Sequence, residues 1–160
     1  MTIVQLTPPQ LEQARQVAHL RNDHKIGAIR NRRVDQRQND LAMNIRGLWG
    51  EIAVAQLFRV CIDDVQRPGG DLGRDLEIAG RSVQVKYNTY PDGDFYFNSL
   101  DEFICELGFL TVPGGRREGL INVVGWITRE EFDIFHAVRD YGYGERVIVK
   151  QNDLYTCRSL

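Results

Sequence analysis

Two short segments on either side of Gly80 constrain the fold more than any other part of the sequence. Residues 75–79 (DLEIA) and 81–86 (RSVQVK) each alternate polar and apolar side chains. A period of two is typical of a β-strand, whose successive side chains point to opposite faces of a sheet. We therefore expect a β-hairpin with one apolar and one polar face; the polar face carries Asp75, Glu77, Gln84 and Lys86.

The position of the turn decides which polar residues of this hairpin face one another. A type II′ turn at Gly80-Arg81 would place Asp75 opposite Lys86, whereas a turn at Ala79-Gly80 would place Asp75 opposite Gln84. Both registers keep the apolar side chains on one face, which a shift of one residue would not. Either hairpin gathers a carboxylate, an amide oxygen and an ammonium group. Such a cluster suits a hard metal ion beside a lysine, although the same residues also form ordinary solvated cross-strand pairs.

The size and composition of the chain set limits on its class. Its 160 residues are expected to form one domain, and its 42% hydrophobic and 26% charged residues are typical of a soluble globular protein. We expect no membrane span, because no apolar run is long enough, and the first residues lack the features of a signal peptide. The three cysteines are far apart, which favours reduced thiols in a cytoplasmic protein.

The net charge of −2 hides an uneven distribution along the chain. Residues 1–50 contain eight Lys or Arg and four Asp or Glu, a net charge of +4, which leaves −6 for the remainder. This asymmetry suits a protein that grips phosphate groups with one part and holds a cation with another, and it is equally typical of solvated helices. The candidate phosphate contacts are Arg30, Arg32, Arg33 and Arg37, followed by Arg116 and Arg117.

Helices and strands are expected to follow one another along the chain. Residues 7–10 (TPPQ) favour a helix start, and a second helix is expected over about 40–60, with Gly47 and Gly50 allowing the close approach of another backbone. Beyond the hairpin we expect strands at 95–97, 109–112, 121–127 and 146–150, and a short helix from the capping box at 128–131 to about Val138. This order predicts an α/β fold with a central mixed sheet of about five strands, helices on both sides and the site at one edge. The expected parts are a basic helical arm (1–39), a core (40–138) and a C-terminal strand and tail (139–160).

Three short motifs resemble those of the PD-(D/E)XK nuclease superfamily, the restriction-endonuclease-like fold that includes Holliday junction resolvases and Mrr-type enzymes. The motifs are 47–51 (GLWGE) in a helix, 73–76 (GRDL) entering a strand and 84–86 (QVK) in the next strand. The superfamily has a helix glutamate, an aspartate, and then an acidic residue two positions before a lysine. The resemblance covers residues 40–90 and continues more loosely to about residue 135. Gln84 departs from the pattern, since an acidic residue is usual there, but glutamine occurs at this place in some Mrr-like members.

The resemblance implies a Mg²⁺- or Mn²⁺-dependent DNA endonuclease whose cleavage is structure-specific or weakly sequence-selective. It makes Asp75 the main metal ligand, with the side-chain oxygen of Gln84, the Val85 carbonyl and Glu51 as further ligands, and it makes Lys86 the group that orients or deprotonates the attacking water. DNA is the implied partner, and cutting both strands would involve a homodimer. Two other hypotheses stay open: a nuclease-fold protein that binds DNA or protein without cutting, and an interaction module encoded by a phage or mobile element.

Overall fold

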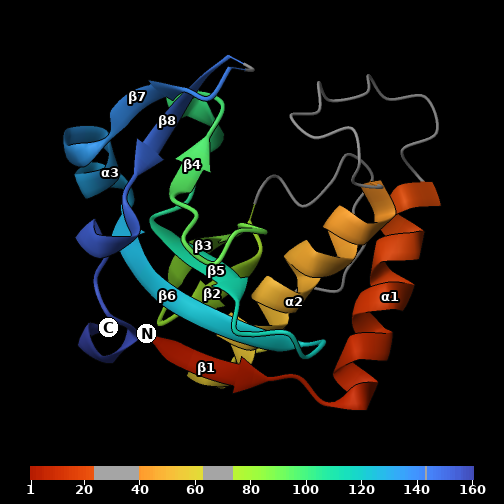
Figure 1. Ribbon diagram of the computed structural model, residues 1–160. Coiled ribbons are helices and arrows are strands. Elements are labelled where there is room, and N and C mark those ends of the chain that lie inside the picture. Colours follow the sequence, from red (N-terminus) through yellow and green to blue (C-terminus); the bar gives the residue numbers. More distant parts are fainter. Residues whose placement is uncertain (24–39, 63–73, 143) are drawn as a thin grey trace.

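The computed structural model, which describes residues 1–23, 40–62, 74–142 and 144–160, is built on a curled sheet of five strands (Figure 1). The strand order is β1-β6-β5-β3-β2. Only β3 and β5 are parallel, so the sheet is mixed. Its strands are β1 (Thr2–Gln5), β2 (Leu76–Ile78), β3 (Arg81–Tyr87), β5 (Leu107–Pro113) and β6 (Leu120–Thr128). The predicted α/β class and the mixed sheet are thus confirmed.

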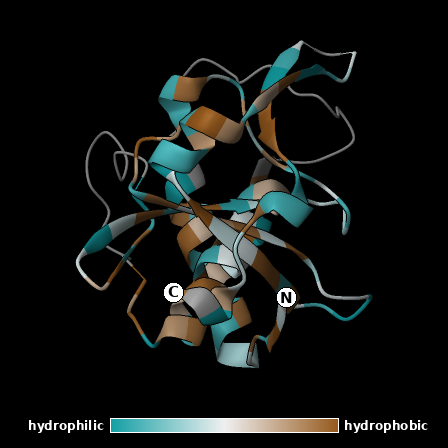
Figure 2. Ribbon diagram, turned by 90° about the vertical axis from the view of Figure 1, so that its left-hand side faces the viewer, coloured by the Kyte–Doolittle hydropathy of each residue, from teal (hydrophilic) through white to brown (hydrophobic). Residues whose placement is uncertain are grey.

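Each face of this sheet is covered by different elements (Figure 1). The helices α1 (Pro8–Asp23) and α2 (Asp40–Phe58) lie against one face, which we call the helix face. On the other face lies a second sheet of order β4-β8-β7, together with α3 (Arg129–Phe135). Its strands are β4 (Phe95–Phe97), β7 (Ala137–Asp140) and β8 (Glu145–Val149), and the remaining elements are the 3₁₀ turns η1 (Leu100–Glu102), η2 (Gln151–Asp153) and η3 (Cys157–Ser159). In Figure 2 much of the hydrophobic colour lies on strands in the middle of the molecule.

Residues 1–23, the described part of the expected basic helical arm over 1–39, pack into the folded core. The strand β1 pairs with β6, and the side chains of Ala14 and Ala18 in α1 are completely buried. The helix start was predicted correctly: the Thr7 main-chain N–H donates to the Gln10 side-chain oxygen at 2.8 Å. The strand β1 was not predicted, and it forms one edge of the large sheet.

The helix α2 approaches the sheet closely at one glycine. A Cβ atom added at Gly50 would lie 2.4 Å from Oγ1 of Thr111 in β5, so only glycine fits there without displacement. At Gly47 no atom of the described residues lies within 4 Å of such a Cβ, so close approach is seen at Gly50 and not at Gly47 within those residues. Gly50 fixes the height of α2 above the sheet, and with it the place of the neighbouring residue Glu51.

The third helix is shorter than predicted. Its capping box forms as expected, with the Thr128 side chain accepting from the Glu131 main-chain N–H, but the helix ends at Phe135 instead of about Val138. His136 has extended backbone angles, and Val138 pairs with Val147 of β8. Pairing with β8 satisfies the backbone groups of β7 (Ala137–Asp140), so tertiary context ends the helix early. None of the helices in the described ranges combines the length and apolar character that crossing a membrane requires.

Candidate functional site

The hairpin of β2 and β3 turns at Ala79-Gly80. Both residues have positive φ angles, 51° and 77°, which is the arrangement of a type I′ turn. Leu76 pairs with Val83, and Ile78 pairs with Arg81. Continued by one residue, this register brings Asp75 opposite Gln84, which is the second of the two registers that the sequence allowed.

Two hydrogen bonds fix Asp75 beside β3. Its main-chain N–H donates to the Val83 carbonyl at 2.9 Å, and its Oδ2 accepts from the Val85 main-chain N–H at 2.6 Å. The second bond is short because a carboxylate is a strong acceptor. The aspartate carboxylate therefore lies at the entrance of β2 and is tied to the backbone of the next strand.

The residues of β3 alternate between the two faces of the sheet. Val83 and Val85 belong to the core beneath α1 and α2, so Gln84 and Lys86 point to the opposite face. Gln84 is 8% exposed, and its side-chain oxygen Oε1 is buried without a hydrogen-bond partner among the described residues. Leaving such an acceptor unsatisfied costs about 1–3 kcal/mol. A buried amide oxygen without a donor, next to a carboxylate, is an arrangement that a cation would satisfy.

The ammonium group of Lys86 lies in a partly apolar setting. Its Nζ is 4.6 Å from the centroid of the Phe97 ring in β4. Burial lowers the pKa of Lys86 below its usual value of 10.5, while the carboxylates of Glu102 and Asp75 oppose that shift. Asp75 and Lys86 are thus close enough to interact electrostatically.

Glu102, in η1, is a member of this cluster that the sequence did not reveal. Its carboxylate accepts from the Asn98 side chain at 2.6 Å and from the Asn98 main chain at 3.0 Å. These two bonds hold the carboxylate where it raises the pKa of Lys86. Nothing in the pattern around residue 102 signals this, because β4 and η1 reach Lys86 only through the tertiary fold.

Glu51 comes to the sheet from the helix face and has a different partner. The residue is 6% exposed, and its Oε1 lies 3.3 Å from Nη1 of Arg21 in α1. Glu102 and Asp75, and not Glu51, are the carboxylates that affect the pKa of Lys86. The structure therefore brings Asp75, Gln84 and Lys86 together but ties Glu51 to α1. Within the described ranges, no three Asp, Glu, His or Cys side chains converge in a way that could hold a metal ion.

The predicted phosphate contacts fall into two groups. Arg30, Arg32, Arg33 and Arg37 lie outside the described residues. Arg116 and Arg117 are exposed in the turn between β5 and β6, where they line a cavity with Arg46 of α2. Arg46 was not predicted to contact phosphate.

Together, these features define an α/β protein with a carboxylate, an amide and a lysine at the open end of a β-hairpin. Neither a scan against models of protein families nor a search of curated proteins finds a match to this sequence.

Proposed function

We propose that this protein is a divalent-metal-dependent DNA nuclease of the PD-(D/E)XK type, with a restriction-endonuclease-like core. The observation that carries this proposal is the meeting of Asp75, Gln84 and Lys86 in the register of the β2–β3 hairpin. The separation of these residues in the sequence matches the motif that the resemblance rests on. Their chemistry also suits phosphodiester hydrolysis, which needs an activated water and compensation of the charge on the phosphate.

A Mg²⁺ or Mn²⁺ ion fits the oxygen atoms at this point of the hairpin. Asp75 would supply a carboxylate, and Gln84 would supply the buried Oε1 that has no hydrogen-bond donor. The Val85 carbonyl faces the same side of β3 as the Val85 N–H, which binds Asp75, so it is a third candidate ligand. Mg²⁺ keeps several waters in its shell, so few protein ligands are enough. When bound, the ion would stabilise charge on the phosphate and lower the pKa of a bound water.

Lys86 would act on the attacking water. Because burial lowers the pKa of Lys86, more of its amine is neutral near neutral pH than in an exposed lysine, and a neutral Nζ can accept a proton from water. In its protonated form the same group would compensate negative charge on the phosphate. Glu102 and Asp75 set the balance between the two forms, since both carboxylates favour the ammonium.

We leave Glu51 out of the proposed direct ligands, because its carboxylate already has the Arg21 guanidinium as a partner. We assign Glu51 a positioning role between α1 and α2. The proposed ion would then have one carboxylate and neutral oxygens as protein ligands, and we expect weaker metal binding than at a site with two carboxylates.

Plasmid cleavage tests the proposal. Purified protein is incubated with supercoiled DNA and with branched DNA at several Mg²⁺ and Mn²⁺ concentrations. We expect nicked or linear products, at least a hundredfold slower cleavage by Asp75→Asn and Lys86→Met, and a rate within twofold of the original for Glu77→Gln. Glu77 is the matched control, because it is an exposed carboxylate in β2, two residues after Asp75. Absence of cleavage on every substrate, or undiminished cleavage by Lys86→Met, would contradict the proposal.

A second function, DNA binding without cleavage, is favoured by the amide at Gln84 and by the pairing of Glu51 with Arg21. The variant Gln84→Glu separates the two functions. If the missing charge alone prevents metal binding, this variant gains Mn²⁺ uptake in calorimetry and cleaves the plasmid, whereas the original protein does neither. An inactive original protein and an inactive Gln84→Glu variant that both bind DNA would leave the non-cleaving function as the better description.

The proposal includes a cytoplasmic setting and the use of two copies to cut both strands. Among the described residues no disulfide joins Cys61, Cys105 or Cys157, which is compatible with a reducing compartment. Sedimentation with and without DNA measures the number of copies in the complex.

A further inference from the structure

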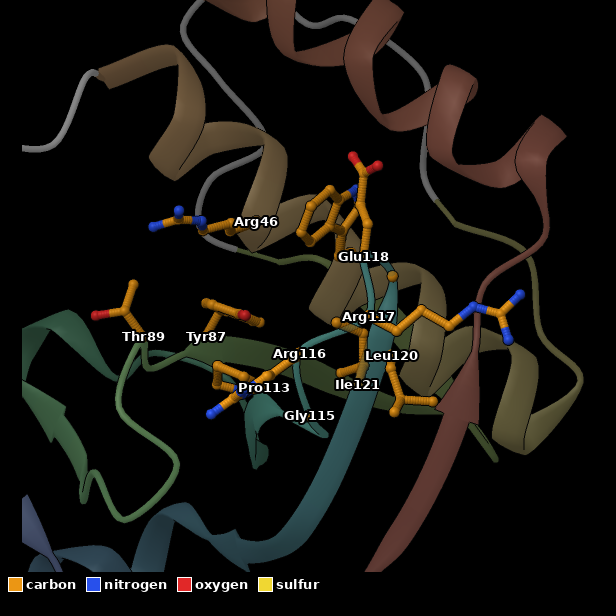
Figure 3. A pocket seen from close by; sticks show the side chains of 12 residues that line it. Arg46, Tyr87, Thr89, Pro113, Gly115, Arg116, Arg117, Glu118, Leu120 and Ile121 are labelled. Carbon is orange, nitrogen blue, oxygen red and sulfur yellow. The ribbon is translucent and has the colours of Figure 1, made fainter.

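A cavity of about 330 Å³ lies on the helix face, near the end of β3 (Figure 3). It is lined by α2, by the last residue of β3 and Thr89 just beyond it, and by the turn between β5 and β6. Tyr87, which lines it, directly follows Lys86 but belongs to the core of the helix face. The cavity and the Asp75–Lys86 cluster are therefore neighbours along β3 that lie on opposite faces of the sheet.

The charge of the cavity lining is positive. It includes Arg46, Arg116 and Arg117, with Glu118 as the one acidic residue among the lining side chains. The Glu118 carboxylate accepts a hydrogen bond from Arg15 of α1 at 2.9 Å, so its charge is already compensated. In the part of the chain that the structure describes, no carboxylate pairs with Arg116. An anion entering the cavity would thus meet the Arg116 guanidinium, which no carboxylate of the described residues neutralises.

Neutral hydrogen-bond donors complete the lining. The indole Nε1 of Trp49 is buried and, within the described ranges, has no hydrogen-bond partner; an indole N–H can only donate. Burial raises the pKa of Tyr87, while the nearby Arg46 lowers it, so the hydroxyl is protonated and able to donate near neutral pH. A cavity that offers guanidinium groups and unsatisfied neutral donors is selective for an anion with several oxygen atoms.

The two arginines of the β5–β6 turn differ in direction. Arg46, Tyr87, Thr89 and Arg116 are grouped at one side of the cavity, whereas the Arg117 side chain extends away from them (Figure 3). Arg116 and Arg117, which the sequence could not separate, both line the cavity, but the Arg116 side chain is the one grouped with Arg46.

We propose that this cavity binds a phosphate group of the DNA backbone, held by Arg46 and Arg116 with the Trp49 N–H as a neutral donor. The inference rests on the proposed nuclease function for its choice of DNA as the source of the phosphate. Because the cavity and the Asp75–Lys86 cluster lie on opposite faces of the sheet, the bound phosphate would belong to a nucleotide distinct from the one being cleaved. The cavity would fix the position of the strand, since phosphate contacts set register and orientation without reading sequence.

Binding without cleavage tests this inference. A fluorescein-labelled 20-base-pair duplex is titrated with the full protein in EDTA, by anisotropy, at several salt concentrations. We expect Arg46→Gln and Arg116→Gln each to weaken binding by about three- to tenfold, and to reduce the slope of log affinity against log salt by about one. Arg116→Lys should recover part of the loss, and Arg117→Gln should weaken binding less than Arg116→Gln, because the Arg117 side chain extends away from Arg46 and Arg116. Circular dichroism confirms the fold of Arg46→Gln, and Arg116→Gln tests the same cavity from an exposed turn.

The outcomes separate this inference from the proposed function. DNA binding that depends on Arg46 and Arg116, in a protein that never cleaves, would support the phosphate cavity and contradict the nuclease proposal. Cleavage and DNA binding that are unchanged in both variants would overturn the cavity alone, as would equal losses in Arg116→Gln and Arg117→Gln. Calorimetry with inorganic phosphate forms the last arm: phosphate uptake that needs Arg116, without any effect of Arg116 on DNA binding, would assign the cavity to free phosphate and overturn the DNA assignment.

Discussion

The two faces of the large sheet are packed in different ways. On the helix face, small residues bring α2 and α1 close to their neighbours: Gly50 lies against Thr111, and Ala14 and Ala53 are completely buried. On the opposite face, four phenylalanine rings interlock at centroid distances of 5.1–5.8 Å; they are Phe95, Phe97, Phe103 and Phe132.

Because the two faces are packed differently, the strand β3 contributes to two polar sites, the Asp75–Lys86 cluster and the cavity. The phenylalanine face supplies the apolar surroundings that lower the pKa of Lys86, since its ammonium lies over Phe97. The helix face leaves room for the cavity beyond the closest approach of α2. Neighbouring residues of β3, Lys86 and Tyr87, therefore meet different environments because their side chains alternate between the faces.

The largest effect is expected from removing a ring of the phenylalanine face. Phe103 is completely buried and contacts the other three rings, so Phe103→Ala should lower the free energy of unfolding by about 3–5 kcal/mol. Tyr96→Ala, a change at an exposed aromatic of β4, should cost much less. Urea denaturation measures both. Equal losses would contradict the view that the interlocked rings hold this face together.

The next effect concerns the charge pair of the helix face. Arg21→Ala leaves the buried Glu51 carboxylate without the Arg21 guanidinium and should cost about 1–3 kcal/mol, less than a fully buried pair because Arg21 is partly exposed. Glu51→Gln keeps hydrogen-bonding capacity without the charge and should cost less. In the double variant the two losses should not add, because the guanidinium and the carboxylate depend on one another.

Non-additivity in urea denaturation identifies Glu51 as a residue that positions α1 and α2. The measurement also bears on the nuclease proposal. If Glu51→Gln abolishes cleavage while the free energy of unfolding stays unchanged, Glu51 acts on the metal or the substrate, and its assignment as a positioning residue is wrong.

The contrast between local and distant contacts explains how much could be predicted. The alternation in 75–86 predicted the hairpin and its polar face, because strand periodicity is written in adjacent residues. The register stayed open, since both turns keep the valines on one face; it is decided by Ala79, which adopts a positive φ beside Gly80. The capping box at 128–131 led us to expect Val138 in a helix. The capping box does form, but Val138 pairs with Val147 in a strand instead.

The partners of the candidate site could not be predicted in this way. Arg21 meets Glu51 from another helix, 30 residues away, and Glu102 reaches Lys86 through η1. No periodic pattern connects such residues, because their contacts depend on how the elements pack. The motif residues alone suggested Glu51 as a metal ligand, and its ion pair with Arg21, which no motif signals, is the basis for the positioning role that we propose.

Two glycines on one helix provide a matched test of the close packing on the helix face. Gly50→Ala would place its Cβ against Oγ1 of Thr111, which itself donates to the Lys86 carbonyl at 3.1 Å, and we expect a loss of about 1–2 kcal/mol from overpacking. Gly47→Ala has open space and should gain up to about 1 kcal/mol through helix propensity. Thermal or urea unfolding compares them. Adding Thr111→Ala should relieve part of the Gly50→Ala loss, and a stabilising Gly50→Ala would show that α2 does not depend on this approach.

The smallest effect is the pH dependence contributed by Lys86, a single partly buried charge on the phenylalanine face. Burial lowers the pKa of Lys86 in the folded protein, so between that lowered value and 10.5 the unfolded chain binds more protons at this residue than the folded protein does. Unfolding then takes up protons, and the contribution of Lys86 to stability rises with pH through that window. Lys86→Met has no such titration, so its stability advantage over the original protein should be greatest below the window and shrink as the pH approaches 10.5. Paired urea denaturation curves from pH 7 to 10.5 measure this difference. Glu102→Gln removes the larger of the two carboxylate effects, so it should lower the pKa of Lys86 further and extend the window to lower pH. A stability difference that does not vary with pH would mean that the ammonium is as well solvated in the folded protein as in the unfolded chain.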